Sequence, residues 1–345
     1  MKYNEEQACS AVPPVLFFKT DHRSQITAHS FIAALALALI CGPASAQQYP
    51  ARPVRFLVPN PPGGGTDLVA RIVSQKVSER WGTSLVVDNR AGAGGIIAVE
   101  VAAKSAPDGY TLLMAHFPLA ITVNIARVSF DPVRDFLPVT LLATTQNLLA
   151  VNPSVPAKSV KELIALAQAK PGQLSYASGG SGTSMHVSAE LFNQMAGVSM
   201  THVPYKGAAP ALVDLISGQV QAAFLSVPAA VPHVKTGKVR GLAVTGSRRS
   251  QLVADLPTLS EAGLKGYGSE QWYGVLVPRE TPRALAQRLN ADFVWALGQT
   301  DTRARLHDSG FEVATDTTEA GFGRFLKSEI DKWAVVVRKA GIKAE

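Results

Sequence analysis

The chain has 345 residues, of which 47% are hydrophobic and 17% charged, and its formal net charge is +7. This composition excludes a disordered or coiled-coil protein, and the length fits roughly two domains of ~150 residues. Lys and Arg are dispersed rather than clustered, and no aromatic residues are interleaved with them, so the charge does not indicate a nucleic-acid partner.

The N-terminal segment has the pattern of a secretory signal peptide. An apolar run spans residues 31–40, with Lys19 and Arg23 before it and Ala44-Ser45-Ala46 after it, which is the small-residue pattern of a cleavage site. The run is too short for a transmembrane helix, which needs ~20 residues. We therefore expect residues 1–46 to be removed and the protein to be exported to the periplasm.

Both cysteines, Cys9 and Cys41, lie in this segment. Attachment of a lipid to Cys41 stays open as an alternative, although Ile40 stands where a small residue is usual. Acidic residues dilute the positive charge near Met1, so a start codon further downstream is also open. The chain from Gln47 onward has no cysteine, which excludes disulfides, thiol nucleophiles and cysteine-ligated metals from the exported protein.

Short apolar runs alternate with amphipathic stretches in the first part of the exported chain. Strands are predicted at 54–58, 85–87 and 111–114, and Gly-rich loops and helices follow them. Asp67 is predicted to cap the first of these helices, which ends at Gly82. The repetition of strand, loop and helix predicts an α/β fold with a largely parallel sheet.

The second part begins near Val139 with an apolar, extended stretch that reaches Val151. Ser159-Val160-Lys161-Glu162 forms a capping box for the next helix. Further strands are predicted at 174–177, 220–225 and 239–244, and helices follow residues 183 and 207. In the tail, Thr281 caps a helix with Pro282 at its first position, and a long final helix runs from about residue 318 to 338.

Three glycine-rich loops each lie between a predicted strand and helix, at residues 61–67, 92–95 and 178–183. Glycine allows a ligand to approach the main chain, and the first N–H groups of the following helix have no partner within it. Together with the helix dipole, such loops bind anions at the carboxyl ends of strands. With the hydroxyls of Ser181, Thr183 and Ser184, they predict an anion-binding cleft.

The loops do not have the sequences of nucleotide sites. None ends in Gly-Lys-Ser/Thr, and Gly92-x-Gly94 lacks the third glycine of a dinucleotide fingerprint. Ser181 lies in a string that resembles a nucleophile elbow without its last glycine, and His186 is one turn into the next helix. A secreted hydrolase that uses Ser181 stays open as an alternative. The histidines have no metal-ligand spacing, so we expect no metal and no cofactor.

A series of motifs runs in order through nearly the whole exported chain. The most specific is His-Val-Pro-Tyr-Lys-Gly at residues 202–207. The others include Pro61–Asp67, Asn89–Gly95, Pro107–Leu112, Pro153–Pro156, Tyr176–Gly179 and Leu256–Gly263. In these motifs the chain resembles the periplasmic substrate-binding proteins of the tripartite tricarboxylate transporters, the Bug or TctC-like family.

The resemblance implies a type II-like Venus-flytrap protein, in which two α/β domains, each a mostly parallel sheet flanked by helices, are joined by a hinge of crossing strands. We expect domain 1 to comprise residues 47–142 and 245–345, and domain 2 residues 143–244. The resemblance also implies a monomer, without enzymatic activity, that delivers a small carboxylate to an inner-membrane permease. A sensor that presents its ligand to a signalling receptor is the open alternative.

The resemblance and the loops together place the ligand between the two domains. The expected contacts are Pro61, Gly63, Gly64, Gly65, Thr66, Asp67 and His116 from domain 1, and Ser178, Gly179, Ser181, Gly182, Thr183, His186, Tyr205, Lys206, Gly207, Ala208 and Ser226 from domain 2. Ser226 and Gln221 stand where many relatives carry Asp, Asn or another acidic residue. A di- or tricarboxylate, an acidic amino acid and an aromatic acid therefore remain open, the last favoured by Phe117 beside His116.

Overall fold

One long strand, β4 (Phe136–Val151), organises the fold by pairing with different strands along its length. Up to Gln146 it pairs antiparallel with β9 (Glu270–Pro278), and from Asn147 onward it lies between β7 (Ala222–Ser226) and β8 (Arg240–Val244). Its side chains are buried almost throughout, as expected of an apolar strand that is covered on both faces.

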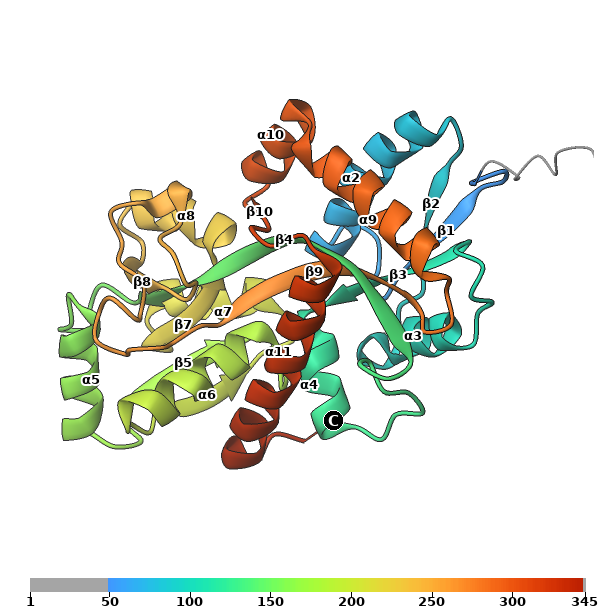
Figure 1. Cartoon of the computed structure of the whole chain (residues 1–345). Coiled ribbons are helices and arrows are strands. Elements are labelled where there is room, and N and C mark those ends of the chain that lie inside the picture. Colours follow the sequence, from blue (N-terminus) through green and yellow to red (C-terminus); the bar gives the residue numbers. More distant parts are fainter. Residues whose placement is uncertain (1–48, 344–345) are drawn as a thin grey trace, which may run out of the picture. The chain divides into compact units, whose positions relative to one another are not determined.

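The computed structural model describes residues 49–343 (Figure 1). The predicted signal peptide, its cleavage site and both cysteines therefore lie outside the described residues. Among the helices within 49–343, none has the length and apolar character needed to cross a membrane.

The outer strands pair in parallel on both sides of this centre. On one side β1 (Val54–Val58) lies between β2 (Leu85–Asn89) and β3 (Thr111–His116), and on the other side β5 (Ser175–Ser178) lies between β6 (Thr201–Pro204) and β7. The strand order is β2-β1-β3-β9-β4-β7-β5-β6, and β10 (Glu312–Val313) pairs with β4. The predicted α/β fold is confirmed. The parallel arrangement is confined to the outer strands, because β9 and β4 are antiparallel to their neighbours.

Helices connect and cover these strands (Figure 1). They are α2 (Gly65–Trp81), α3 (Ile96–Ala103), α4 (Phe117–Ile125), α5 (Val160–Ala169), α6 (Ser184–Ala196), α7 (Ala208–Ser217), α8 (Val227–Lys235), α9 (Arg283–Gly298), α10 (Thr300–Asp308) and α11 (Glu319–Ala340), with short 3₁₀ turns at Ala93–Gly95 and Gln251–Val253.

The long helix α11 contacts helices from both halves of the sheet. It lies against α4 and α6, and its apolar stripe buries Phe322, Leu326 and Trp333. The Asn124 side chain donates to the Ile330 carbonyl at 3.1 Å on one side, and Gln194 donates to the Val336 carbonyl at 3.0 Å on the other. The helix therefore ties α4, which follows β3, to α6, which follows β5.

Capping explains where several helices begin. Ser159 accepts a hydrogen bond from the Glu162 N–H at 3.2 Å, so the predicted cap of α5 is confirmed. The predicted cap Asp67 is wrong, because α2 begins two residues earlier and Gly64 precedes it. The predicted cap Thr281 is also wrong, since α9 starts at Arg283 and Pro282 occupies the cap position.

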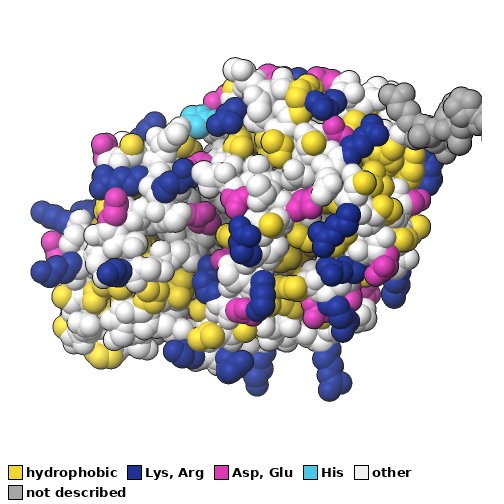
Figure 2. Space-filling view, in the orientation of Figure 1, with side chains coloured by type: hydrophobic (Ala, Val, Ile, Leu, Met, Phe, Trp, Pro, Cys, Tyr) yellow, Lys and Arg dark blue, Asp and Glu magenta, His cyan; other side chains and the backbone are white. Residues whose placement is uncertain are grey.

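Charge is spread over the surface rather than gathered. Figure 2 shows Lys and Arg side chains distributed over one face of the molecule, with Asp and Glu among them. Among the described residues, many charged side chains form ion pairs, such as Arg249 with Glu261 at 2.9 Å and Lys327 with Asp331 at 2.6 Å. Exposed pairs of this kind contribute little to stability, about 0–1 kcal/mol each, so folding depends mainly on the buried sheet and its helices.

The close contact of β9 with α11 leads to a prediction about the free energy of unfolding. A Cβ built on Gly274 would overlap the Phe322 ring, and it would lie 2.8 Å from Cε1 and Cε2. We expect Gly274→Ala to lower the free energy of unfolding by about 1–3 kcal/mol, because the ring or the strand must shift. The control is Gly298→Ala at the end of α9, where a Cβ meets nothing within 4 Å and alanine favours the helix. Urea unfolding measures both, and equal losses would contradict the prediction.

Candidate functional site

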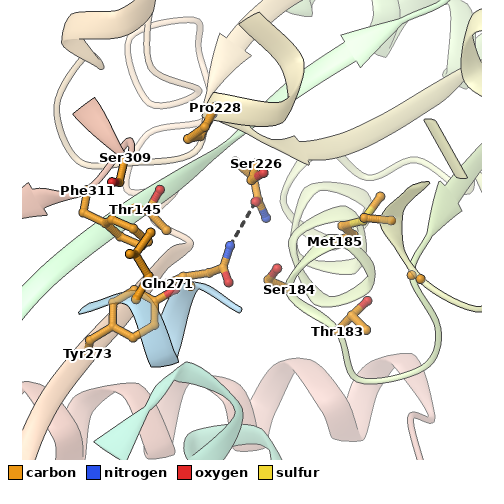
Figure 3. Close-up of a pocket in the computed structure, with 16 residues that line it drawn as sticks. Thr145, Thr183, Ser184, Met185, Ser226, Pro228, Gln271, Tyr273, Ser309 and Phe311 are labelled. Atoms are coloured by element: carbon orange, nitrogen blue, oxygen red, sulfur yellow. Dashed lines mark hydrogen bonds between the residues drawn. The ribbon is translucent and has the colours of Figure 1, made fainter. Parts of the chain in front are cut away.

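A cavity of about 450 Å³ lies where the first turns of four helices meet (Figure 3). The helices α2, α6, α7 and α8 follow β1, β5, β6 and β7 along the chain. They contribute Gly65, Leu68, Thr183, Ser184, Met185, Gly207, Ala208, Ser226 and Pro228 to the lining. The N–H groups of a helix's first turn lack partners within the helix and lie at the positive end of its dipole. Four helix N-termini around one cavity favour the binding of an anion in it.

The remaining walls come from the central strands and from the segment between α10 and β10. They comprise Thr145, Asn147, Gln271, Tyr273, Ser309 and Phe311, and Gly179 completes the lining from the loop after β5. The lining residues of this cavity include hydroxyls, amides and apolar groups, and none carries a charged side chain. Binding of an anion here therefore depends on hydrogen-bond donors and dipoles, not on an ion pair.

Asn147 is held at the point where β4 changes its partners. Its side-chain amide donates to the Ser188 hydroxyl at 3.3 Å. Its oxygen accepts from the Gln271 amide at 3.4 Å, the bond drawn as a dashed line from Gln271 in Figure 3. The Ser188 and Ser269 hydroxyls are 2.7 Å apart, and Tyr267 donates to the Ser188 carbonyl at 2.7 Å. This buried network fixes the polar floor of the cavity.

Two glycines allow close approach around the cavity. A Cβ on Gly65 would lie 3.1 Å from the Tyr273 hydroxyl, and a Cβ on Gly179 would lie 3.2 Å from the carbonyl carbon of Gly207. The Tyr273 ring meets the edge of Phe311 at a centroid distance of 5.4 Å. Glycine therefore brings the starts of α2 and α7 close to the opposite walls.

The structure brings together some of the residues expected from the sequence and separates others. Those that line the cavity are Gly65, Gly179, Thr183, Gly207, Ala208 and Ser226. Those outside its lining are Pro61, Gly63, Gly64, Thr66, Asp67, His116, Ser178, Ser181, Gly182, His186, Tyr205 and Lys206. The binding role of each residue stays a prediction.

Asp67 braces the loop before α2. Its carboxylate accepts from the Gly63 N–H at 3.0 Å, from Arg71 Nε at 2.8 Å and from the Asn89 amide at 3.0 Å. Burial opposes ionisation, but the hydrogen bonds from Arg71, Gly63 and Asn89 outweigh it and hold the pKa of Asp67 below its usual value. The acidic side chain is thus occupied within the protein.

Two stacked histidines brace the loop before α6. The rings of His186 and His202 are 3.9 Å apart and nearly parallel, and Ser178 Oγ lies 2.6 Å from His202 Nε2. Burial and the neighbouring His202 lower the pKa of His186 to about 4, so its ring is neutral near pH 7. Its Nδ1 accepts from the Gly182 N–H at 3.1 Å, and this bond takes the one acceptor nitrogen of the neutral ring, which a Ser181 hydrolase would need as its base.

Three more of the expected residues outside the lining are His116, Tyr205 and Lys206. His116 is buried at the end of β3, within 3.4 Å of a Cβ built on Gly95, and burial lowers its pKa to about 3. Tyr205 donates to Asp214 at 2.7 Å, and this hydrogen bond raises the pKa of Tyr205 to about 12. Lys206 is exposed to solvent.

Residues 69–342 match the family described as the tripartite tricarboxylate transporter family receptor, TctC. The chain belongs to this family of transporter receptors. It is 36% identical over 312 residues to the protein BugT of Bordetella pertussis, covering 90% of this chain and 95% of BugT.

Solved structures of other family members have the same fold. A protein of R. palustris with adipate is 37% identical, with a TM-score of 0.71, over 86% of this chain and 99% of its own. MatC from Rhodopseudomonas palustris with bound malate is 34% identical, with a TM-score of 0.69, over 84% and 100%. A TctC solute-binding protein from Polaromonas, without ligand, is 26% identical, with a TM-score of 0.77, over 84% and 99%.

Some residues that line the cavity were missed by the sequence analysis. Thr145 and Asn147 lie two residues apart on β4, as do Gln271 and Tyr273 on β9. Side chains two apart in a strand point to the same face, so polar pairs within apolar strands were a usable signal. Ser309 and Phe311 carry no such signal, because a helix end places them.

The buried histidine of β3 leads to a prediction about how the free energy of unfolding depends on pH. His116 has a pKa of about 3 when folded and about 6.5 when unfolded, so only the unfolded chain takes up a proton as the pH falls below 6.5. This costs about 1.4 kcal/mol of stability per pH unit down toward pH 3. We expect His116→Gln to make the loss of unfolding free energy between pH 6.5 and 4.5 smaller.

Urea unfolding at several pH values measures this slope. The control is His307→Gln, because the His307 side chain is 48% exposed, and we expect that variant to keep the slope of the original protein. A His116→Gln variant whose stability falls as steeply with pH as that of the original protein would contradict the assignment.

Proposed function

We propose that this chain is a periplasmic solute-binding protein that captures a small carboxylate in the cavity described above and presents it to a membrane permease of the tripartite type. The observation that carries the proposal is the convergence of four helix N-termini on one cavity whose lining has no charged side chain. Such a site neutralises an anion with oriented N–H groups and hydroxyls.

Hydrogen bonds from these N–H groups and hydroxyls are strong enough to give micromolar binding. A hydrogen bond to a charged acceptor contributes ~1.5–3 kcal/mol, and micromolar binding corresponds to about 8 kcal/mol. Three or four N–H and hydroxyl groups from α2, α6, α7 and α8 reach this range without an ion pair. The apolar side chains of Met185 and Phe311 add buried contact for the carbon chain of the acid.

The relatives favour an acid with two carboxylates. One was solved with adipate and another with malate, and this chain aligns with nearly the full length of both proteins. Both ligands are dicarboxylates, and a cavity with helix ends on several sides suits a ligand charged at both ends. Adipate and malate are therefore the probes with which to begin.

Closure of two domains over the ligand is part of the proposal. The change of partners between Gln146 and Asn147 and the chain's return between β8 and β9 support crossing strands as the hinge. We assign residues 47–142 and 245–345 to one domain and 143–244 to the other. The protein acts as an exported monomer, cleaved after Ala46, without catalysis, and delivery to a signalling receptor is the alternative to transport.

Binding of dicarboxylates tests the proposed function. We expect adipate or malate to raise the melting temperature of the purified protein by several degrees at 100 times the dissociation constant, where the added stability is ~2.7 kcal/mol. Because the grip is short-range and buried, affinity measured by calorimetry should change little between 50 and 200 mM salt, a range that weakens exposed charge pairs. The proposal fails if sugars or metal ions stabilise the protein and carboxylates do not.

Two variants on neighbouring loops distinguish binding of the ligand by N–H and hydroxyl groups from binding by a cationic side chain. Thr183 donates to the Gly180 carbonyl at 2.8 Å and accepts from the His186 N–H at 3.4 Å, so Thr183→Val loosens the start of α6, at a cost of about 1 kcal/mol. We expect it to weaken adipate binding about fivefold or more. Lys206→Met removes an exposed cation outside the cavity and should change affinity less than about twofold. The opposite order would mean that Lys206 holds the ligand.

A further inference from the structure

The turn after α10 rests against the start of α8. Gly310 follows the end of α10 with φ of +80°, and its N–H donates to the His307 carbonyl at 2.8 Å. A Cβ built on Gly310 would overlap Pro228 Cγ, and it would also lie 3.0 Å from Pro228 Cβ and 3.1 Å from Cδ. The proline ring therefore occupies the space that any other residue at position 310 would fill.

The two partners of this contact belong to different parts of the sheet. Pro228 is at the start of α8, directly after β7, which pairs with β4 beyond Asn147. Gly310 is followed by β10, which pairs with β4 before Gln146. The contact thus joins elements on either side of the point where β4 changes partners, which is the hinge of the proposed closure.

The turn is anchored firmly on its own side. The Thr145 hydroxyl donates to the Gly310 carbonyl at 2.8 Å, and the Phe311 ring packs edge-on against Tyr273. Ser309 and Phe311 line the cavity from this turn, and Ser226 and Pro228 line it from the start of α8 (Figure 3). The contact between Gly310 and Pro228 therefore closes one side of the cavity.

From this geometry we propose that Gly310 and Pro228 form a latch that holds the two domains together over the ligand and thereby sets its affinity. The absence of a side chain at position 310 is what lets the proline ring reach the turn. This inference rests on the proposed function for the ligand, but the distance between the domains can be measured without one, so the latch is also testable in unliganded protein.

The first test measures adipate affinity by calorimetry. Gly310→Ala keeps the domains from meeting, and we expect it to weaken adipate binding at least about tenfold. The control is Gly82→Ala, which puts the same residue at a positive φ after α2, where a Cβ meets nothing within 4 Å. We expect it to stay within about twofold of the original protein. Gly310→Ala combined with Pro228→Gly should recover most of the lost affinity, because the overlapping ring is gone.

The second test needs no ligand. The chain from Gln47 onward has no cysteine of its own, so spin labels on Val86→Cys of β2 and Val213→Cys of α7, both exposed positions, report the distance between the domains. We expect Gly310→Ala to shift the unliganded distance distribution, and the double variant with Pro228→Gly to restore it.

The two tests separate the latch from the proposed function. If the original protein does not bind adipate, the choice of ligand is wrong, and the unliganded distances alone decide on the latch. If Gly310→Ala matches Gly82→Ala in both affinity and distance distribution, the latch is overturned.

Discussion

The rest of the structure depends on the requirement that β4 pair along its whole buried length. Backbone N–H and C=O groups without partners are costly in a protein interior, so β4 must be paired at both ends. It pairs with β9 up to Gln146 and with β7 and β8 from Asn147 onward. The changeover brings the starts of four helices around one cavity, and Thr145 and Asn147 lie on its floor.

The polar groups around this cavity are divided between two tasks. Side chains such as Asp67, His186 and Thr183 spend their hydrogen bonds on holding loops in place. First-turn N–H groups have no partners within their helices, so those that the loops leave unpaired are available to a ligand. A site built in this way holds its donors rigidly before a ligand arrives, which lowers the entropy lost on binding.

Local signals in the sequence predict the parts of the fold and site that depend on neighbouring residues. The glycine-rich loops, the Ser159 cap and the final helix follow from patterns a few residues long. The central strand β9 did not follow, because Trp272 to Val277 form a short apolar run without clear alternation. Its place beside β4 depends on pairing across more than a hundred residues.

The same distinction divides the candidate site. Gly65 and Gly179 were predicted from their glycine-rich loops, and Gly207 from the family resemblance and its position before a helix; all three line the cavity, and their binding role stays a prediction. Tyr273 and Phe311 meet there only because β9 and the end of α10 are brought together by tertiary packing. Asp67 and His186 lie outside the cavity lining and hydrogen-bond the loops beside them, because a polar residue beside a glycine-rich loop can brace that loop as readily as contact a ligand.

The central claim is that backbone N–H groups at helix starts hold the ligand, and amide chemical shifts test it most directly. Titration of ¹⁵N-labelled protein with adipate should move the amide protons of Ser184 and Ala208 downfield, with one shared dissociation constant, as they bond to a carboxylate. Saturable binding that leaves these amides unmoved while the Lys206 or Arg90 side-chain signals shift would contradict the account.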